Sequence, residues 1–311
     1  MQRQLTGRYT LIFILIYAAA LSVLYFQFHQ SLADIFTVLF AFGIVFPVLA
    51  WLLTKRWPMP DEKPAFRNEW LVIILLVLFF TWYVTFGSAF INKFIPKDIL
   101  AIAWKTSIAV LLKKLLVFVL VPLLIYKTAG FSLKDFGFRI SGNRLFSRET
   151  LLPFFILSVV VVLFQYYFSG GAEPIRKGQF AFRQLIITWP LLFLWLFIEA
   201  GLVEEFFFRA VLQSRIAAML KSPAGGIVIS SIIFGLAHAP GLYLRGAESE
   251  GISEQLPFHF WGAYTICYMS LAGLFLGIIR YRTNNIYLLM ALHAMVDILP
   301  NTKEFIATWH I

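Results

Sequence analysis

The sequence has few charged side chains for its length. Asp, Glu, Lys and Arg make up 14% of its 311 residues, and hydrophobic residues make up 60%. Soluble domains carry about 25% charged residues. The shortage therefore excludes an ordinary soluble domain and predicts an integral membrane protein that crosses the bilayer several times.

Cysteine is nearly absent as well. The sequence contains one, Cys267, so an internal disulfide is excluded, and its apolar surroundings indicate a packing role. The net charge of +10 comes without a basic patch on a polar domain, so nucleic acid is not an expected partner. Lys and Arg collect in short loops beside hydrophobic segments, where they meet anionic lipid.

Long hydrophobic segments recur along the whole chain, and a helix needs about 20 residues to cross the hydrocarbon core. We place nine of them near residues 9–27, 33–53, 70–91, 108–126, 150–168, 185–203, 226–239, 264–280 and 286–299. The fourth contains Lys113 and Lys114, so its first half is expected to lie at the interface or to face protein. The pattern predicts an all-α transmembrane bundle of about eight or nine spans.

The distribution of Lys and Arg over the loops predicts the orientation. With the N-terminus in the cytoplasm, the cytoplasmic segments hold about twice as many Lys and Arg as the opposite side. That count treats Arg209, Arg215 and Lys221 as one cytoplasmic segment after the sixth span. The stretch 241–260 is expected to be a long acidic loop.

Ionisable side chains appear in the hydrophobic segments after residue 199. Glu204, Glu205 and Arg209 lie in VEEFFFRAVLQ, His238 lies in SSIIFGLAHAP and His293 lies in LLMALHAMVD. A charged side chain at the bilayer centre costs about 2.5–3.5 kcal/mol on insertion scales. A sequence that keeps carboxylate, guanidinium and imidazole side chains in hydrophobic segments at this cost favours a catalytic site.

Helical spacing sorts these residues into pairs. Glu205 and Arg209 are four apart and can pair, whereas Glu204 is rotated by about 100° and points elsewhere. Glu204 is thereby left as a free carboxylate that suits general-base work on water. His293 and Asp297 are also four apart, and an Asp one turn away can accept the ring proton and fix the tautomer.

Simpler roles are open for several of these positions. Arg209 could extend to the cytoplasmic interface as a snorkelling side chain, and either histidine alone could be a packing residue. Phe234 and residues 206–208 are expected to pack or to contact lipid. Glu199 could line the same cavity as Glu204, or cap a helix break beside Gly201.

Three motifs in order resemble the CAAX protease and bacteriocin-processing family. They are Glu-Glu-x-x-x-Arg at 204–209, Phe-x-x-x-His at 234–238 and His-x-x-x-Asp at 293–297. FSLKDFGFR at 131–139 is similar to a cytoplasmic lead-in of these proteins, and the resemblance covers about residues 130–300. The family groups intramembrane proteases related to the type II CAAX prenyl endopeptidases.

The resemblance implies an all-helical intramembrane fold with a conical polar cavity. It implies an endopeptidase that hydrolyses a peptide bond in a membrane-tethered protein or peptide, located in a bacterial cytoplasmic membrane. The Lys and Arg count places the N-terminus inside. Residues 106–311 would form the catalytic transmembrane domain. Residues 1–105 would form N-terminal accessory transmembrane helices.

The resemblance also implies roles for the site residues. Glu204 would activate the attacking water with the help of His238, and His293 would donate to the oxyanion. Glu205 and Arg209 would order the site.

Asp297 departs from the Asn that the family's best-studied members carry at this position. An Asn amide donates a hydrogen bond to an oxyanion, whereas an ionised Asp cannot. Asp297 is therefore protonated, or orients His293, or binds a metal. We favour orientation of His293.

The need for a metal ion stays open at this point. Glu204, His238 and His293 could form a two-histidine, one-carboxylate zinc site, but the sequence has no HExxH motif. We favour catalysis without a cofactor, and zinc is the alternative.

Other functions remain as alternatives to a peptidase. A non-enzymatic membrane scaffold or bacteriocin self-immunity protein is the first, because family members are linked to both. A transporter is the second, but the sequence shows no inverted repeat. GxSG and GxGD motifs are absent, which disfavours rhomboid-like serine and presenilin-like aspartyl proteases.

Overall fold

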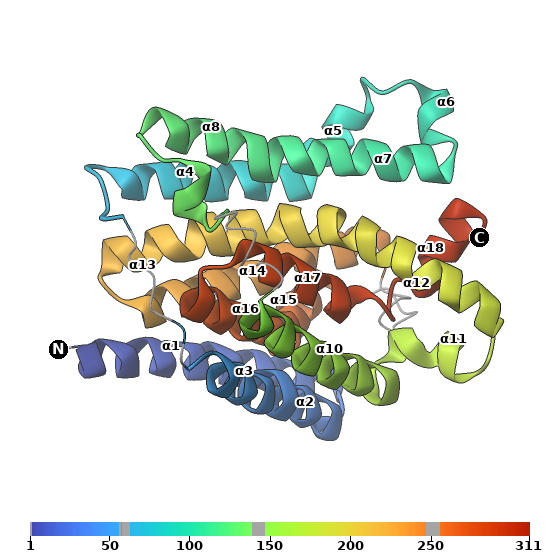
Figure 1. Ribbon diagram of the computed structural model, residues 1–311, viewed down its shortest axis with the longest axis horizontal. Helices are drawn as coiled ribbons and strands as arrows, with labels where there is room; N and C mark the ends of the chain where they lie inside the picture. The colour runs from blue at the N-terminus through green and yellow to red at the C-terminus, as the bar shows by residue number, and fades with distance from the viewer. Residues whose placement is uncertain (1, 56, 58–62, 139–146, 247–255) are drawn as a thin grey trace.

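The computed structural model describes residues 2–55, 57, 63–138, 147–246 and 256–311, and every regular element in them is a helix (Figure 1). Eight helices are long and apolar enough to cross a membrane: Gly7–Gln27, Leu32–Thr54, Glu69–Asn92, Ala103–Thr128, Arg148–Phe168, Phe182–Leu220, Pro223–Leu244 and Phe258–Thr283. Ile286–Asp297 is a shorter apolar helix. The predicted all-α membrane bundle is confirmed.

The N-terminal helices form one side of the bundle, along the bottom of Figure 1. They are α1 (Gln2–Ser22), η1 (Val23–Gln27), α2 (Leu32–Val38), η2 (Leu39–Val45) and α3 (Phe46–Thr54). Edge-to-face ring contacts join this layer to the rest, since Phe42 and Phe46 both pack against Phe164 and Phe275. Such pairs stabilise a core beyond their buried area.

A second layer runs along the top of Figure 1. It comprises α4 (Glu69–Trp82), η3 (Tyr83–Gly87), α5 (Ser88–Asn92), α6 (Lys97–Leu100), α7 (Ala103–Lys114), η4 (Leu115–Leu120) and α8 (Val121–Thr128). Lys113 is buried and donates to Ser88 Oγ at 3.0 Å and to Asn92 Oδ1 at 2.7 Å. Lys114, the next residue, pairs with Glu199, so both lysines of this span face protein.

The segment after α8 holds the lead-in seen in the sequence. The 3₁₀ turn η5 (Leu133–Phe136) begins with a capping box between Ser132 and Asp135. Arg139 and residues 140–146 lie outside the described residues. Three elements follow: α10 (Arg148–Phe168), η6 (Gly170–Ala172) and α11 (Glu173–Arg176).

One continuous helix of 39 residues, Phe182–Leu220, crosses the middle of the molecule. It is built from α12 (Phe182–Leu196), η7 (Phe197–Leu202), η8 (Glu205–Gln213) and α13 (Ser214–Leu220). The prediction that this span ends at residue 203 is wrong, and so is a helix break beside Gly201. The helix continues because Glu205 and Arg209 pair inside it and neutralise each other.

Most of the C-terminal helices occupy the centre, and the last one lies at the edge beside the C-terminus (Figure 1). They are α14 (Pro223–Arg245), α15 (Phe258–Cys267), α16 (Met269–Thr283), α17 (Ile286–Asp297) and α18 (Thr302–Trp309). In the span Phe258–Thr283, 67% of the most apolar window is buried, against 22–39% in the other seven spans. This span is therefore the one that the others surround. Because α14 reaches residue 245, the predicted loop at 241–260 starts too early, and residues 247–255 are outside the described residues.

Candidate active site

Glu204 lies between the two π-helical segments η7 and η8. Short π-helical segments occur often at functional sites, because the extra residue redirects side chains. Its Oε2 atom is 3.7 Å from Nε2 of His238 and 3.8 Å from Nε2 of His293. The structure thus brings together three residues that the sequence placed on three separate helices.

His238 is held from its own helix. Its Nδ1 lies 2.8 Å from the carbonyl oxygen of Phe234, one turn earlier in α14. A carbonyl oxygen is an acceptor, so Nδ1 carries the proton, and Nε2 of the neutral ring is an acceptor. The acceptor nitrogen is the one that faces Glu204.

His293 is held from the facing helix. Its Nδ1 is 2.6 Å from Oε1 of Glu205, and the other oxygen of Glu205 is 3.4 Å from Nε of Arg209. The three side chains therefore form a chain of contacts in which Glu205 is shared. Glu205 and Arg209 are 0% and 1% exposed, so each needs the other, since an isolated buried charge is very unfavourable.

The burial of Arg209 decides between the roles that the sequence left open. Its guanidinium lies 4.0 Å from the ring centroid of Phe234, a distance at which a cation is attracted to the ring face. The snorkelling alternative for Arg209 is wrong, because its side chain is buried inside the protein. Phe234 and residues 206–208 are buried as well, so they pack in the core and do not contact lipid.

Asp297 lies on the other side of the His293 ring. Its Oδ2 is 3.4 Å from Nε2 of His293, and Nδ1 already contacts Glu205. The shortest carboxylate contact of His293 is therefore with Glu205. The four-residue spacing predicted the contact with Asp297. No local sequence pattern predicted the contact with Glu205, because it comes from another helix.

A glycine brings the two halves of the site together. At Gly201 in η7, a Cβ atom would lie 2.6 Å from the carbonyl oxygen of Met290 in α17. Only a residue without a side chain permits this approach. The close packing places the helix of Glu204 directly against the helix of His293.

Two further charged residues adjoin Glu204. The ammonium group of Lys114 forms a short ion pair with Oε1 of Glu199 and lies 4.0 Å from Oε1 of Glu204. Sequence reasoning gave Lys114 no role at the site. The signal that could have found it was a lysine in the middle of an apolar span, already expected to face protein.

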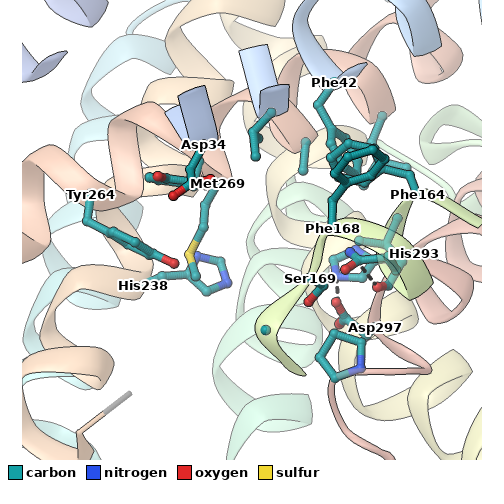
Figure 2. A pocket seen from close by; sticks show the side chains of 18 of the residues that line it. Asp34, Phe42, Phe164, Phe168, Ser169, His238, Tyr264, Met269, His293 and Asp297 are labelled. Atoms are coloured by element: carbon teal, nitrogen blue, oxygen red, sulfur yellow. Dashed lines mark hydrogen bonds and ion pairs between the residues drawn. The ribbon is translucent and has the colours of Figure 1, made fainter. Parts of the chain in front are cut away.

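Two cavities meet at this cluster. One of about 460 Å³ is lined by His238, His293 and Asp297 together with aromatic side chains, and Figure 2 shows the two histidines entering it from different helices. The second, of about 450 Å³, is lined by Lys114, Glu199, Glu204 and Asp297. Asp297 is common to both. The predicted polar cavity inside the bundle is thus present.

Among the residues that the structure describes, no three His, Cys, Asp or Glu side chains are grouped so that they could hold a metal ion. The zinc site considered for Glu204, His238 and His293 remains an untested alternative.

Comparison with known families gives one match. Residues 186–299 match the family model described as type II CAAX prenyl endopeptidase Rce1-like, a family of proteases. The match confirms the resemblance that the three motifs indicated, and it covers all six predicted site residues: Glu204, Glu205, Arg209, His238, His293 and Asp297. Comparisons with curated proteins and with solved structures gave no match.

Proposed function

We propose that the protein is an intramembrane endopeptidase that hydrolyses a peptide bond in a membrane-associated protein or peptide. The observation that carries the proposal is the position of the Glu204 carboxylate, which faces Nε2 of both histidines at 3.7 and 3.8 Å. The match of this segment to a protease family supports it. The bilayer is the second partner, because eight helices can span it.

The first step is activation of water by Glu204. The separation of 3.7 Å from His238 is too long for a direct hydrogen bond and suits a bridging water. Oε2 of Glu204 accepts no hydrogen bond from a described residue, so it can accept the water proton. The water O–H bond breaks, its oxygen forms a bond to the carbonyl carbon, and His238 holds the water through Nε2.

His293 stabilises the oxyanion that then forms on the substrate. With Nδ1 donating to Glu205, a second proton on Nε2 is available to the carbonyl oxygen as it becomes negative. When the intermediate collapses, the C–N bond breaks and Glu204 returns its proton to the leaving nitrogen. Arg209 balances the charge of Glu205 throughout.

Asp297 restrains the same ring from its other edge. Its carboxylate lies 3.4 Å from Nε2 of His293 and lines both cavities. In this role Asp297 limits rotation of the imidazole, and Glu205 fixes the ring through Nδ1.

We further propose that catalysis needs no metal ion. If zinc does bind, Glu204, His238 and His293 would be its ligands and it would polarise the water. Metal content of the purified protein tests this directly. Stoichiometric zinc that is lost together with activity on chelation would contradict metal-independent catalysis.

The experiment for the main proposal compares N-terminal peptides of the host membrane proteome in three strains. They express the wild type, Glu204→Ala and Glu149→Ala at matched levels, the last as a control because Glu149 is exposed on α10. New termini in the wild type and the control that are missing in Glu204→Ala would identify substrates. Identical termini in all three strains would refute the peptidase and favour the scaffold or immunity function.

A further inference from the structure

The π-helical turn η7 changes which residues share a face of the central helix. In a regular α-helix, residues five apart are rotated by about 140° from each other. In a π-helix the hydrogen bonds run from residue i to i+5, so residues five apart come closer to a common face. Glu199 lies within η7 and Glu204 lies five residues later. Both carboxylates therefore point toward α7.

Lys114, the last residue of α7, reaches both carboxylates with one ammonium group. It contacts Oε1 of Glu204 from the edge opposite to Oε2, which is the oxygen that faces the two histidines. The side chains of Lys114, Glu199 and Glu204 are 24%, 18% and 13% exposed. The interaction is thus partly sheltered from solvent screening.

We propose that Lys114 is a positioning residue that neutralises Glu199 and thereby keeps Glu204 ionised and able to act as the base. The inference rests on the proposed peptidase function, and it adds to the site a residue that lies outside the segment matched by the family model.

The physical reason is repulsion between two carboxylates in one sheltered place. Like charges at close range cannot both stay ionised easily, and one of the pair takes up a proton. A proton on Glu204 would remove the base. Lys114 prevents this by pairing closely with Glu199. Its longer distance to Glu204, 4.0 Å, leaves that carboxylate available to water.

Other charged or titratable groups also face Glu204. His238 approaches from α14, and His293 and Asp297 approach from α17. These groups belong to the reaction side of the carboxylate. Lys114 approaches the other oxygen of Glu204, and neither Lys114 nor Glu199 takes part in the proposed steps at the substrate carbonyl.

The test is a double-mutant cycle with Lys114→Met, Glu199→Gln and the combined variant. Lys114→Met is expected to lower kcat by about 10- to 100-fold with little change in KM, because general-base catalysis contributes about 10²–10⁴-fold. Adding Glu199→Gln removes the repelling carboxylate and should restore kcat to within about tenfold of wild type. Lys114→Arg keeps the charge and should retain activity.

Lys113→Met is the matched control. Lys113 is the neighbouring buried lysine, and it donates hydrogen bonds to Ser88 and Asn92 rather than to the residues of the site. If loss of a buried lysine acts only through folding, Lys113→Met and Lys114→Met should lower activity alike, and Glu199→Gln should rescue neither. Activity is measured with an internally quenched peptide that carries a prenylated CAAX tail, a probe suggested by the family match.

A second measurement needs no substrate. The infrared carbonyl band of a protonated carboxylic acid should appear in Lys114→Met relative to wild type and should vanish in Lys114→Met/Glu199→Gln. Absence of that band in folded Lys114→Met, or a folded double variant no more active than Lys114→Met, would overturn the proposal. A wild type that cleaves nothing would refute the peptidase function, and Glu204→Gln with full activity would refute Glu204 as the base. Neither outcome would change the infrared result.

Discussion

The ion pair between Glu69 and Arg215 gives the sharpest test of how this bundle is held together. Arg215 donates from Nε to Oε1 of Glu69 at 2.5 Å and from Nη2 to Oε2 at 2.9 Å. Its guanidinium also donates to the carbonyl oxygens of Lys63 and Pro64 at 2.9 and 3.1 Å and lies 4.6 Å from the ring centroid of Phe131. The pair joins α4 to α13, with side chains only 1% and 2% exposed.

Arg215→Met is expected to destabilise the fold by about 3–5 kcal/mol, because it leaves the carboxylate of Glu69 buried without a counter-charge. For a chain of this size that corresponds to a fall in Tm on the order of 10 °C. The double variant Glu69→Leu/Arg215→Met removes both charges. It should recover most of the loss, because hydrophobic replacement of a buried pair is often neutral.

The assay is thermal unfolding in detergent, followed by the fluorescence of the nine tryptophans. Lys177→Met is the control, since Lys177 and Glu173 form an ion pair whose side chains are 63% and 53% exposed; it should leave Tm unchanged, as exposed pairs contribute little. A Tm of Arg215→Met equal to that of the control, or a double variant less stable than Arg215→Met, would refute the reasoning.

Four further predictions concern the site and other contacts in the bundle. Glu205→Gln should lower kcat about 10²-fold or more, because it weakens the 2.6 Å contact with His293. Asp297→Asn should stay within about tenfold of wild type in the same peptide assay, and a loss of several orders of magnitude would show that Asp297 is not an interchangeable polar group. Gly201→Ala should lower the free energy of unfolding by about 1–3 kcal/mol, because its Cβ would lie 2.6 Å from a backbone oxygen. The measurement is Tm, and an unchanged Tm would contradict the close packing. Burial raises the pKa of Asp135, but hydrogen bonds from the Ser132 backbone and from Lys63 outweigh it and hold that pKa below its usual value. Its stabilising contribution should be present at neutral pH and lost as the pH falls below about 4, so Asp135→Asn should lower Tm at pH 7 and should differ little from wild type in acid.

Much of this architecture was predictable from composition and spacing. The apolar segments gave the spans, and the four-residue spacing predicted the pair of Glu205 and Arg209 that the structure contains. Local periodicity carries this kind of information because it reports on one helix at a time.

Contacts between helices were not predictable in the same way. The contact of Glu205 with His293 joins residues 88 positions apart, and that of Lys114 with Glu199 joins residues 85 apart. The π-helical segments were also not predictable from the sequence, because a hydrophobic segment has the same composition in an α-helix and in a π-helix. They shift the phase of the central helix, and this shift turns Glu199 and Glu204 toward the same lysine.

The enclosed position of the span Phe258–Thr283 has a consequence for biosynthesis. At about 5–20 residues per second, the ribosome adds His293, 88 residues further on, about 4–18 seconds after Glu205. The helix that carries Glu204 is therefore translated while the middle of the bundle is still missing. Under the proposed function, a nascent chain at this stage contains Glu204 but not His293. It therefore cannot hydrolyse neighbouring proteins at the insertion site. Hydrolysis becomes available only after the surrounded span and α17 have entered the bundle.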